Sequence, residues 1–173
     1  MTYLYDAGRP RGSVVVIPTI WLGLVLSLLI HILVIWLYLP QIRALLELDG
    51  GEPSKAIELL QIARPYERGI PPSVAPWFIG PFFTIYVRGL AYLAAHQGPE
   101  AAVEFQKVID GRTIVVSDPI GALAHLQLGR ALAMSGDKAK AKSAYQDFLT
   151  LWKDADPDIA ILTQAQAEYA KLP

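Results

Sequence analysis

Three histidines are the side chains of this chain whose ordinary pKa lies closest to neutral pH, and they stand far apart in the sequence. His31 lies inside a long apolar run, His96 stands directly before Gln-Gly, and His125 lies in a segment rich in Ala and Leu. No two of them have the spacing of metal ligands on one helix face, and the chain has no Cys for a thiolate nucleophile or a Cys-bound metal. We interpret His96 and His125 as helix-end or packing residues.

The remaining polar residues form no pattern that would support catalysis. Asp154, Asp156 and Asp158 surround Pro157, but the Gly and the terminal Glu of a calcium loop are missing. Neither a nucleophile with an adjacent base nor a phosphate-binding loop is present, and the formal net charge of −1 gives no electrostatic footprint for nucleic acid. We therefore predict a protein that is not an enzyme, with no catalytic residue, no cofactor and no nucleic-acid partner.

From Gly12 to Ile42 the chain contains no Asp, Glu, Lys or Arg. About 20 apolar residues are enough to cross the hydrocarbon core of a bilayer, and a cleavable signal peptide has an apolar region of only about 7–15 residues before small residues. Here Trp36 and Tyr38 stand where small residues would be needed. The run predicts a single N-terminal transmembrane helix over residues 14–39, preceded by a short tail over residues 1–13.

The charges that flank this span predict its orientation. Arg9 and Arg11 precede it, whereas Arg43 is followed by several acidic residues before the next Lys. Because Lys and Arg are enriched in cytoplasmic flanks, the tail is expected in the cytoplasm and the C-terminal domain on the opposite side of the membrane.

Small and polar residues follow one side of the predicted span. Gly23, Ser27 and His31 are spaced by four residues, and Tyr38 lies further along the helix. Gly and Ser permit another helix to approach closely, and Ser and His can form hydrogen bonds across such a contact. We predict that Gly23, Ser27, His31 and Tyr38 contact the helix of a membrane protein partner.

After the span, one spacing of small and aromatic residues recurs. A Gly is followed by an Ala twelve residues later and by an aromatic residue four positions after that Ala. The set is Gly89, Ala101 and Phe105 in residues 89–109, and Gly129, Ala141 and Tyr145 in residues 129–149, while Ala56 and Leu60 repeat the final pair in residues 51–63. Small residues let two antiparallel helices approach closely, and the aromatic residue one turn later fills the gap to the next pair.

This pattern resembles the tetratricopeptide repeat, a helix–turn–helix unit of about 34 residues. The resemblance implies an all-α fold with a short repeat solenoid over residues 40–157, interrupted by loops at 64–81 and 111–119. Residues 158–173 are expected to form a C-terminal capping helix that begins at an Asp158 N-cap.

The run from FFTIYVRGLAYLAAHQ through DPIGALAHLQLGRALAMSGDKAKAKSAYQDFLTLWKDADPDIAILTQAQAEYAKL also resembles the C-terminal region of acidobacterial membrane serine/threonine kinases that carry tetratricopeptide domains. This chain has no Gly-rich loop, HRD or DFG motif, so the resemblance implies the repeat domain without phosphotransfer. It also implies a bacterial membrane protein; with the charge bias of the flanks, we expect a single-pass inner-membrane protein whose C-terminal domain lies in the periplasm.

Two alternatives remain open for His31. The spacing of Ser27 and His31 is similar to that in the membrane anchor of TonB-type proteins, where the pair couples to a proton-driven motor. A single histidine before an aromatic helix end also resembles light-harvesting helices, which would make His31 an axial ligand of a pigment or haem. The prediction from the residues themselves is a contact with a partner helix.

Tetratricopeptide arrays bind peptides along the surface of their first helices, and the resemblance places five residues there. They are Phe83, Tyr86, Leu90, Leu126 and Arg130. We therefore predict a membrane-anchored protein that binds a protein or peptide partner, as a scaffold or accessory subunit of a membrane complex.

Overall fold

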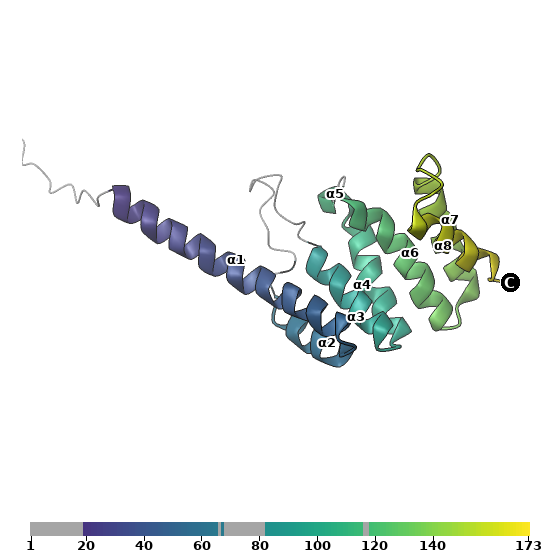
Figure 1. Cartoon of the computed structure of the whole chain (residues 1–173), viewed down its shortest axis with the longest axis horizontal. Helices are drawn as coiled ribbons and strands as arrows, with labels where there is room; N and C mark the ends of the chain where they lie inside the picture. The colour runs from purple at the N-terminus through teal and green to yellow at the C-terminus, as the bar shows by residue number, and fades with distance from the viewer. Residues whose placement is uncertain (1–18, 66, 68–81, 116–117) are drawn as a thin grey trace, which may run out of the picture. The chain divides into compact units, whose positions relative to one another are not determined.

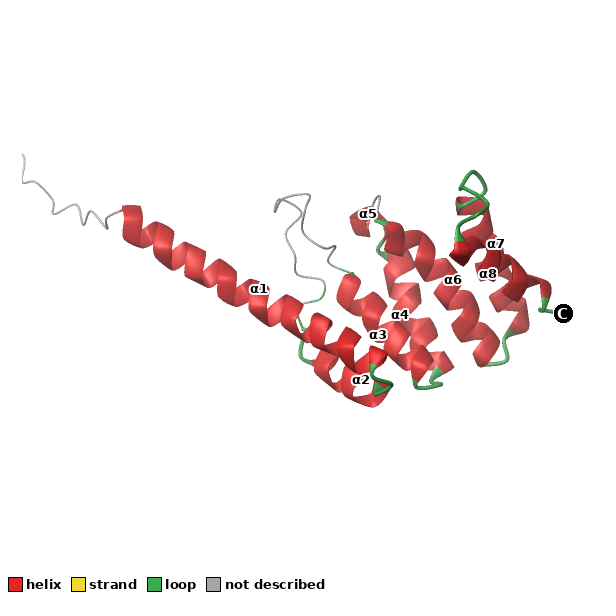
Figure 2. Cartoon of the chain, viewed as in Figure 1, coloured by secondary structure: helices red, strands yellow, loops and turns green. Residues whose placement is uncertain are grey.

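The computed structural model describes residues 19–65, 67, 82–115 and 118–173, and this part of the chain is helical without strands (Figures 1 and 2). The prediction of an all-α fold is confirmed. The chain divides into two compact units, Met1–Trp36 and Leu37–Pro173. The helices are α1 (Thr19–Asp49), α2 (Pro53–Gln61), α3 (Phe83–Ala94), α4 (Gly98–Asp110), α5 (Arg112–Val115), α6 (Pro119–Met134), α7 (Lys138–Leu151) and α8 (Ala160–Ala170).

The first unit contains the apolar part of α1. Among the residues that the structure describes, no helix has both the length and the hydropathy of a membrane span. The predicted span over 14–39 falls partly outside the described residues, since residues 14–18 and the side chains of Ile30 and of residues 33–38 are not described. The predicted tail over residues 1–13 lies outside them as well.

Three helix pairs build the second unit. The C-terminal part of α1 pairs with α2, α3 pairs with α4, and α6 pairs with α7 (Figure 1). Helix α3 packs against both α2 and α4, and α6 packs against both α4 and α7. Each inner helix therefore lies between two others, which is the arrangement of a helical repeat.

The three turns within these pairs have the same backbone structure. Two positions after the end of each first helix stands a residue with positive φ, namely Gly51 (76°), His96 (57°) and Gly136 (82°). After each of these, the next residue donates its N–H to a carbonyl five residues earlier, as Gln97 does to Tyr92 at 2.8 Å. This is a Schellman motif, which satisfies the last carbonyls of a helix. His96 lies in a turn directly after α3, as expected.

Close approach of the two helices in a pair explains the recurring glycines. A Cβ added to Gly89 would lie 2.7 Å from the ring of Phe105, and a Cβ added to Gly129 would lie 2.7 Å from the ring of Tyr145. Real Cβ atoms do not approach carbon atoms so closely, so these two positions require glycine while the aromatic ring is present.

In the first helix pair, other residues fill the space between the two helices. Ala44 and Leu60 stand at the positions of Gly89 and Phe105, and both are fully buried. A larger residue on one helix thus faces a smaller one on the other. The alanines of the recurring pattern are also fully buried, and they are Ala56, Ala101 and Ala141.

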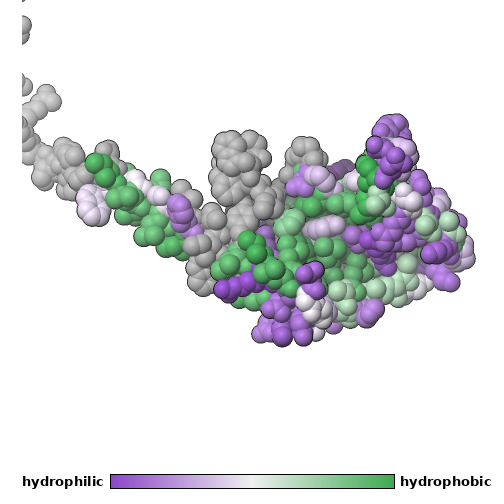
Figure 3. All heavy atoms as spheres, in the orientation of Figure 1, coloured by the Kyte–Doolittle hydropathy of each residue, from purple (hydrophilic) through white to green (hydrophobic). Residues whose placement is uncertain are grey.

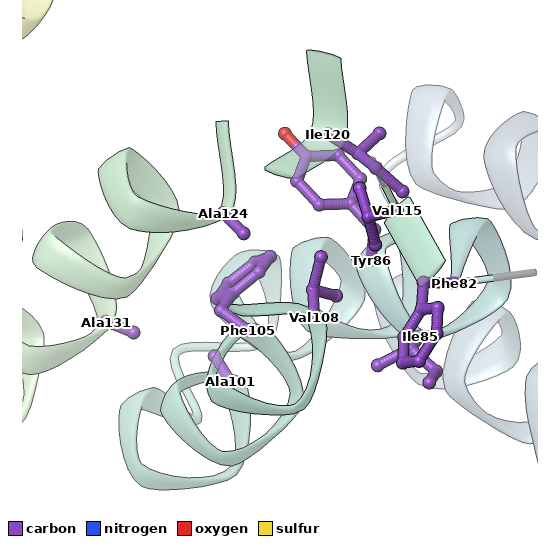
Figure 4. Close-up of a cluster of buried hydrophobic side chains, with 10 residues drawn as sticks. All are labelled: Phe82, Ile85, Tyr86, Ala101, Phe105, Val108, Val115, Ile120, Ala124 and Ala131. Atoms are coloured by element: carbon purple, nitrogen blue, oxygen red, sulfur yellow. The ribbon is translucent and has the colours of Figure 1, made fainter. Parts of the chain in front are cut away.

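The largest apolar cluster lies between α3, α4 and α6 (Figure 4). Tyr86 of α3 and Phe105 of α4 meet edge to face, with ring centroids 5.6 Å apart. Ile120 and Ala124 of α6 complete the same cluster. Burial of these side chains is the main force that holds the second and third pairs together.

Helix α8 covers the last apolar face, where Leu162 and Ala165 are buried against Leu126 and Phe148. The predicted N-cap is wrong: α8 begins after Ile159, without a side-chain cap, and the N–H of Asp158 instead bonds the carboxylate of Asp156 at 3.0 Å. The predicted loop over 111–119 also needs correction, because it contains the short helix α5.

Candidate partner-binding surfaces

The predicted helix-contact residues of α1 are exposed where they are described. A Cβ added to Gly23 would meet no atom within 4 Å among the described residues. His31 Nδ1 lies 2.7 Å from the carbonyl oxygen of Ser27 and 3.4 Å from its hydroxyl. A carbonyl only accepts, so this geometry puts a proton on Nδ1 and leaves Nε2 of a neutral ring as an acceptor. The Tyr38 side chain lies outside the described residues.

The five predicted groove residues do not share one surface. Phe83, Leu90 and Arg130 are half-buried, whereas Tyr86 is buried against Phe105. Leu126 is fully buried in the cluster beneath α8. Only the first three are therefore accessible to a partner.

Arg130 is held by a polar network that sequence reasoning did not identify. Its Nε and Nη2 donate to the two carboxylate oxygens of Glu168 on α8, at 2.8 and 2.9 Å. Tyr145 donates its hydroxyl to the same carboxylate at 2.8 Å. Burial alone would raise the pKa of Glu168, but the bonds from Arg130 and Tyr145 hold it below its usual value. Burial and the Glu168 carboxylate raise the pKa of Tyr145.

A second, more deeply buried ionic cluster lies on α3. Arg88 is fully buried and places Nη2 2.5 Å from Glu104 of α4 and 2.7 Å from Glu67, which follows α2. Lys107 bonds Glu104 at 2.8 Å, and Arg64 lies 3.6 Å from it. Although burial favours the neutral acid, the bonds from Arg88 and Lys107 lower the pKa of Glu104. An Arg within the apolar sequence FTIYVRGLAYLA was the signal for this cluster.

His125 lies inside α6, with Nδ1 3.7 Å from the carboxylate of Asp147 on α7. Burial lowers the pKa of His125 more than Asp147 raises it, so the ring is neutral at neutral pH. Among the described residues, no three His, Cys, Asp or Glu side chains gather in a way that would hold a metal ion.

Two clefts lie along α6, between α4 and α7. One is a cavity of about 410 Å³, and its lining residues are Ala102, Val103, Gln106, Leu128, Leu132, Lys140, Ser143, Ala144 and Asp147. The other, of about 590 Å³, lies nearer α5 and includes His125 and Trp152. Both are open surface features with mostly apolar walls, which suits the binding of polypeptide side chains better than chemistry.

No family model, no curated protein and no solved structure matches this chain. The interpretation of its surfaces therefore rests on the geometry described above and on the sequence patterns.

Proposed function

We propose that this chain is a membrane-anchored helical-repeat protein that mediates protein–protein interaction, as a scaffold or accessory subunit of a membrane complex. In this proposal the N-terminal part of α1 crosses the membrane and the repeats, of tetratricopeptide type, bind the partner. The protein belongs to a bacterial inner membrane, with its N-terminus in the cytoplasm and its repeat domain in the periplasm.

The observation that carries the proposal is the exposed apolar surface of α1. Large apolar side chains are exposed along the N-terminal part of α1, and Figure 3 shows green spheres on the face of this helix that it presents. Ile20 is 74% exposed, Leu24 57% and Leu28 61%. In the described N-terminal part of α1, up to Ile32, the large apolar residues that are exposed are Ile20, Trp21, Leu22, Leu24, Val25, Leu26, Leu28, Leu29 and Ile32. Burying one such side chain contributes about 1.5–3 kcal/mol, so water is an unfavourable surrounding for this surface and lipid a favourable one.

The partner surface of the repeats is proposed to include Phe83, Leu90 and Arg130. These are the accessible members of the predicted groove, whereas Tyr86 and Leu126 are buried. A groove of aromatic and aliphatic residues favours an apolar or amphipathic segment.

A sodium carbonate wash of native membranes tests the anchor. We expect the full chain to stay in the membrane pellet, and the variant Leu26→Asp/Leu29→Asp to be released, because charge in the middle of a span is costly. Lys138→Asp/Lys153→Asp, which changes exposed lysines of the repeat domain, is the matched control and should stay bound. Release of the unaltered chain would contradict the proposed anchor.

Protease added to intact spheroplasts tests the orientation. The repeat domain should be degraded and a small membrane fragment should remain. Protection of the domain until the membrane is opened would place it in the cytoplasm and refute the proposed topology.

A second candidate function uses the pair Ser27 and His31. The bond from Nδ1 to the Ser27 carbonyl leaves Nε2 as an acceptor, which suits a hydrogen bond from a partner helix, proton-coupled contact of the TonB type, or axial ligation of a pigment or haem. Ser27→Leu should weaken copurification of a partner if the contact is steric. If the pair couples to a proton-driven motor, His31→Gln should abolish the proton-driven activity of the complex but keep association with the partner. If His31 is an axial ligand, the same variant should lose the absorption band of the bound pigment or haem.

A further inference from the structure

We propose that the groove of α4, α6 and α7 binds a partner segment that carries aliphatic side chains next to a Lys or Arg. By this groove we mean the cavity of about 410 Å³ described above. The inference rests on the proposed role of the repeats in protein binding, and it places a contact on the side of α6 opposite to Gln127 and Arg130.

An equivalent groove within the same molecule supports this inference. Counted from the positive-φ residues His96 and Gly136, three positions of the two grooves correspond. Arg88 corresponds to Leu128, Glu104 to Ala144 and Lys107 to Asp147. The first member of each pair belongs to the ionic cluster on α3, and the second lines the cavity on α6.

The groove on α3 shows what such a surface holds. Two described residues after α2 contact it: Glu67 pairs with Arg88, and Arg64 lies 3.6 Å from Glu104. Arg88 and Glu104 of the groove thus each lie near an opposite charge of these residues, while Lys107 bonds Glu104 within the groove. The occupant is a short stretch of polypeptide whose side chains complement the floor and the wall.

Helix length explains why the residues that follow α4 do not cover the groove on α6 in the described part of the chain. Helix α2 has 9 residues, so the chain can turn across the groove soon after the helix begins. Helix α4 has 13 residues and continues along the groove as its wall, through Gln106 and beyond. The equivalent covering position on α6 is therefore left to another segment.

The lining of the second groove defines the chemistry of its occupant. Its floor is apolar where the first groove has Arg88, because Leu128 takes that place and Leu132 lies one turn further along α6. On the wall, Asp147 is the acidic group, and its neighbour His125 is neutral at neutral pH. Lys140 is already paired with Asp137 at 2.8 Å. Aliphatic side chains over the leucines and one basic side chain beside Asp147 complement this lining.

The test uses the full chain in lipid nanodiscs and an array of eight-residue peptides, each with two residues from Leu, Ile and Val and one Lys. A second array replaces every Lys by Glu. We expect the unaltered protein to bind members of the Lys array about two- to fivefold more tightly than their Glu counterparts, which is the size of an exposed charge pair. No binding to either array would overturn the inference.

Two variants test the location of the site. Val103→Glu should weaken binding at least about tenfold, and Asp147→Lys should reverse the preference so that the Glu array binds more tightly. Val103 is 56% exposed and the Asp147 side chain 59%, so both variants should fold, as thermal melting would show. Met134→Glu and Asp154→Lys change exposed residues outside the lining and should bind like the unaltered chain.

The outcomes separate this inference from the proposed function. Binding that Val103→Glu and Asp147→Lys leave unchanged would place the peptides elsewhere and overturn the groove, while membrane anchoring would still stand on its own test. Self-association of the unaltered chain that Val103→Glu abolishes would make a second copy the occupant, and would also overturn the inference. Release of the chain by carbonate, with peptide binding intact, would refute the anchor alone.

Discussion

Replacement of Gly89 by Ala tests the packing that defines the helix pairs. The added Cβ would lie 2.7 Å from two carbons of the Phe105 ring, so the ring or the helix must move. Overpacking of this kind costs about 1–3 kcal/mol. Ala is preferred to Gly within a helix by about 1 kcal/mol. The net effect should be a loss of about 1 kcal/mol in the free energy of unfolding.

The first helix pair provides the compensating change. There, Ala44 faces Leu60 and both are fully buried. The double variant Gly89→Ala/Phe105→Leu copies that arrangement into the second pair. Phe105→Leu alone should cost about 1–2 kcal/mol through a cavity, but in the double variant the new methyl group occupies part of that space. The double variant should therefore be more stable than the sum of the single effects predicts, by about 1–2 kcal/mol.

Urea unfolding of the full chain in nanodiscs, followed by far-ultraviolet circular dichroism, measures all three free energies. Gly50→Ala is the control, because a Cβ there would meet its nearest atom, a backbone oxygen, at an ordinary 3.4 Å. It should change the free energy of unfolding by no more than about 0.5 kcal/mol. If the effects of Gly89→Ala and Phe105→Leu add within about 0.5 kcal/mol, the ring is not the obstacle and the explanation of the recurring spacing is refuted.

Three further predictions concern the same domain. Ala141→Leu should lower the free energy of unfolding by about 1–3 kcal/mol through overpacking, since Ala141 is fully buried; unchanged urea unfolding would contradict this. The folded-state pKa of Glu168 is lowered, so its stabilisation is present above the unfolded pKa of about 4.3 and is lost as the pH falls through the folded value. Melting temperature should fall between about pH 5 and pH 3, and less so in Glu168→Gln; identical pH profiles would refute the role of that pair. Glu104→Ala leaves Arg88 buried beside one carboxylate and should lower the free energy of unfolding by about 3–5 kcal/mol. The double variant Arg88→Leu/Glu104→Ala, which copies Leu128 and Ala144, should lose less. Equal losses in urea unfolding would show that the buried ion pair does not determine the effect.

Local spacing was sufficient to predict the helix pairs. The interval from Gly to Ala to aromatic residue reports contacts within one pair, between helices joined by a three-residue turn. The contacting residues are close in sequence and separated by a fixed interval, so the interval can be recognised in one sequence. The same holds for the all-α class, which the resemblance of this spacing to the tetratricopeptide repeat implies.

The faces of α6 were harder to predict, because α6 packs against α4 on one side and α7 on the other. Apolar residues therefore occur almost all around this helix, and the sequence does not show which of them face a neighbour. Leu126 was assigned to the groove for this reason, although it is buried beneath α8. Arg130 is half-buried and bonds Glu168, which is 38 residues away, and no local spacing relates the two residues.

The partners of Arg88 in the ionic cluster on α3 could not be predicted for a related reason, although an Arg in an apolar sequence indicates a buried charge. A charged residue is read as exposed unless its partners are known, and the partners of Arg88 come from α4 and from the segment after α2. The cluster depends on where the chain after α2 turns, which is a matter of tertiary structure.

The three helix pairs show why the repeats diverge in sequence while their backbones agree. The positive-φ turn and its hydrogen bonds recur in all three pairs, and they constrain the backbone rather than particular side chains. Between the helices, the requirement is a constant filled volume, which Gly with Phe105, Gly with Tyr145, and Ala44 with Leu60 all meet. On the outer side, a residue must be chemically complementary to the groups that contact it. Equivalent positions can therefore hold a charged residue, Arg88, in one pair and an apolar residue, Leu128, in the next. Constant volume between the helices and chemical complementarity on their outer side thus constrain adjacent residues of one helix. Only the volume constraint produces a regular spacing in the sequence.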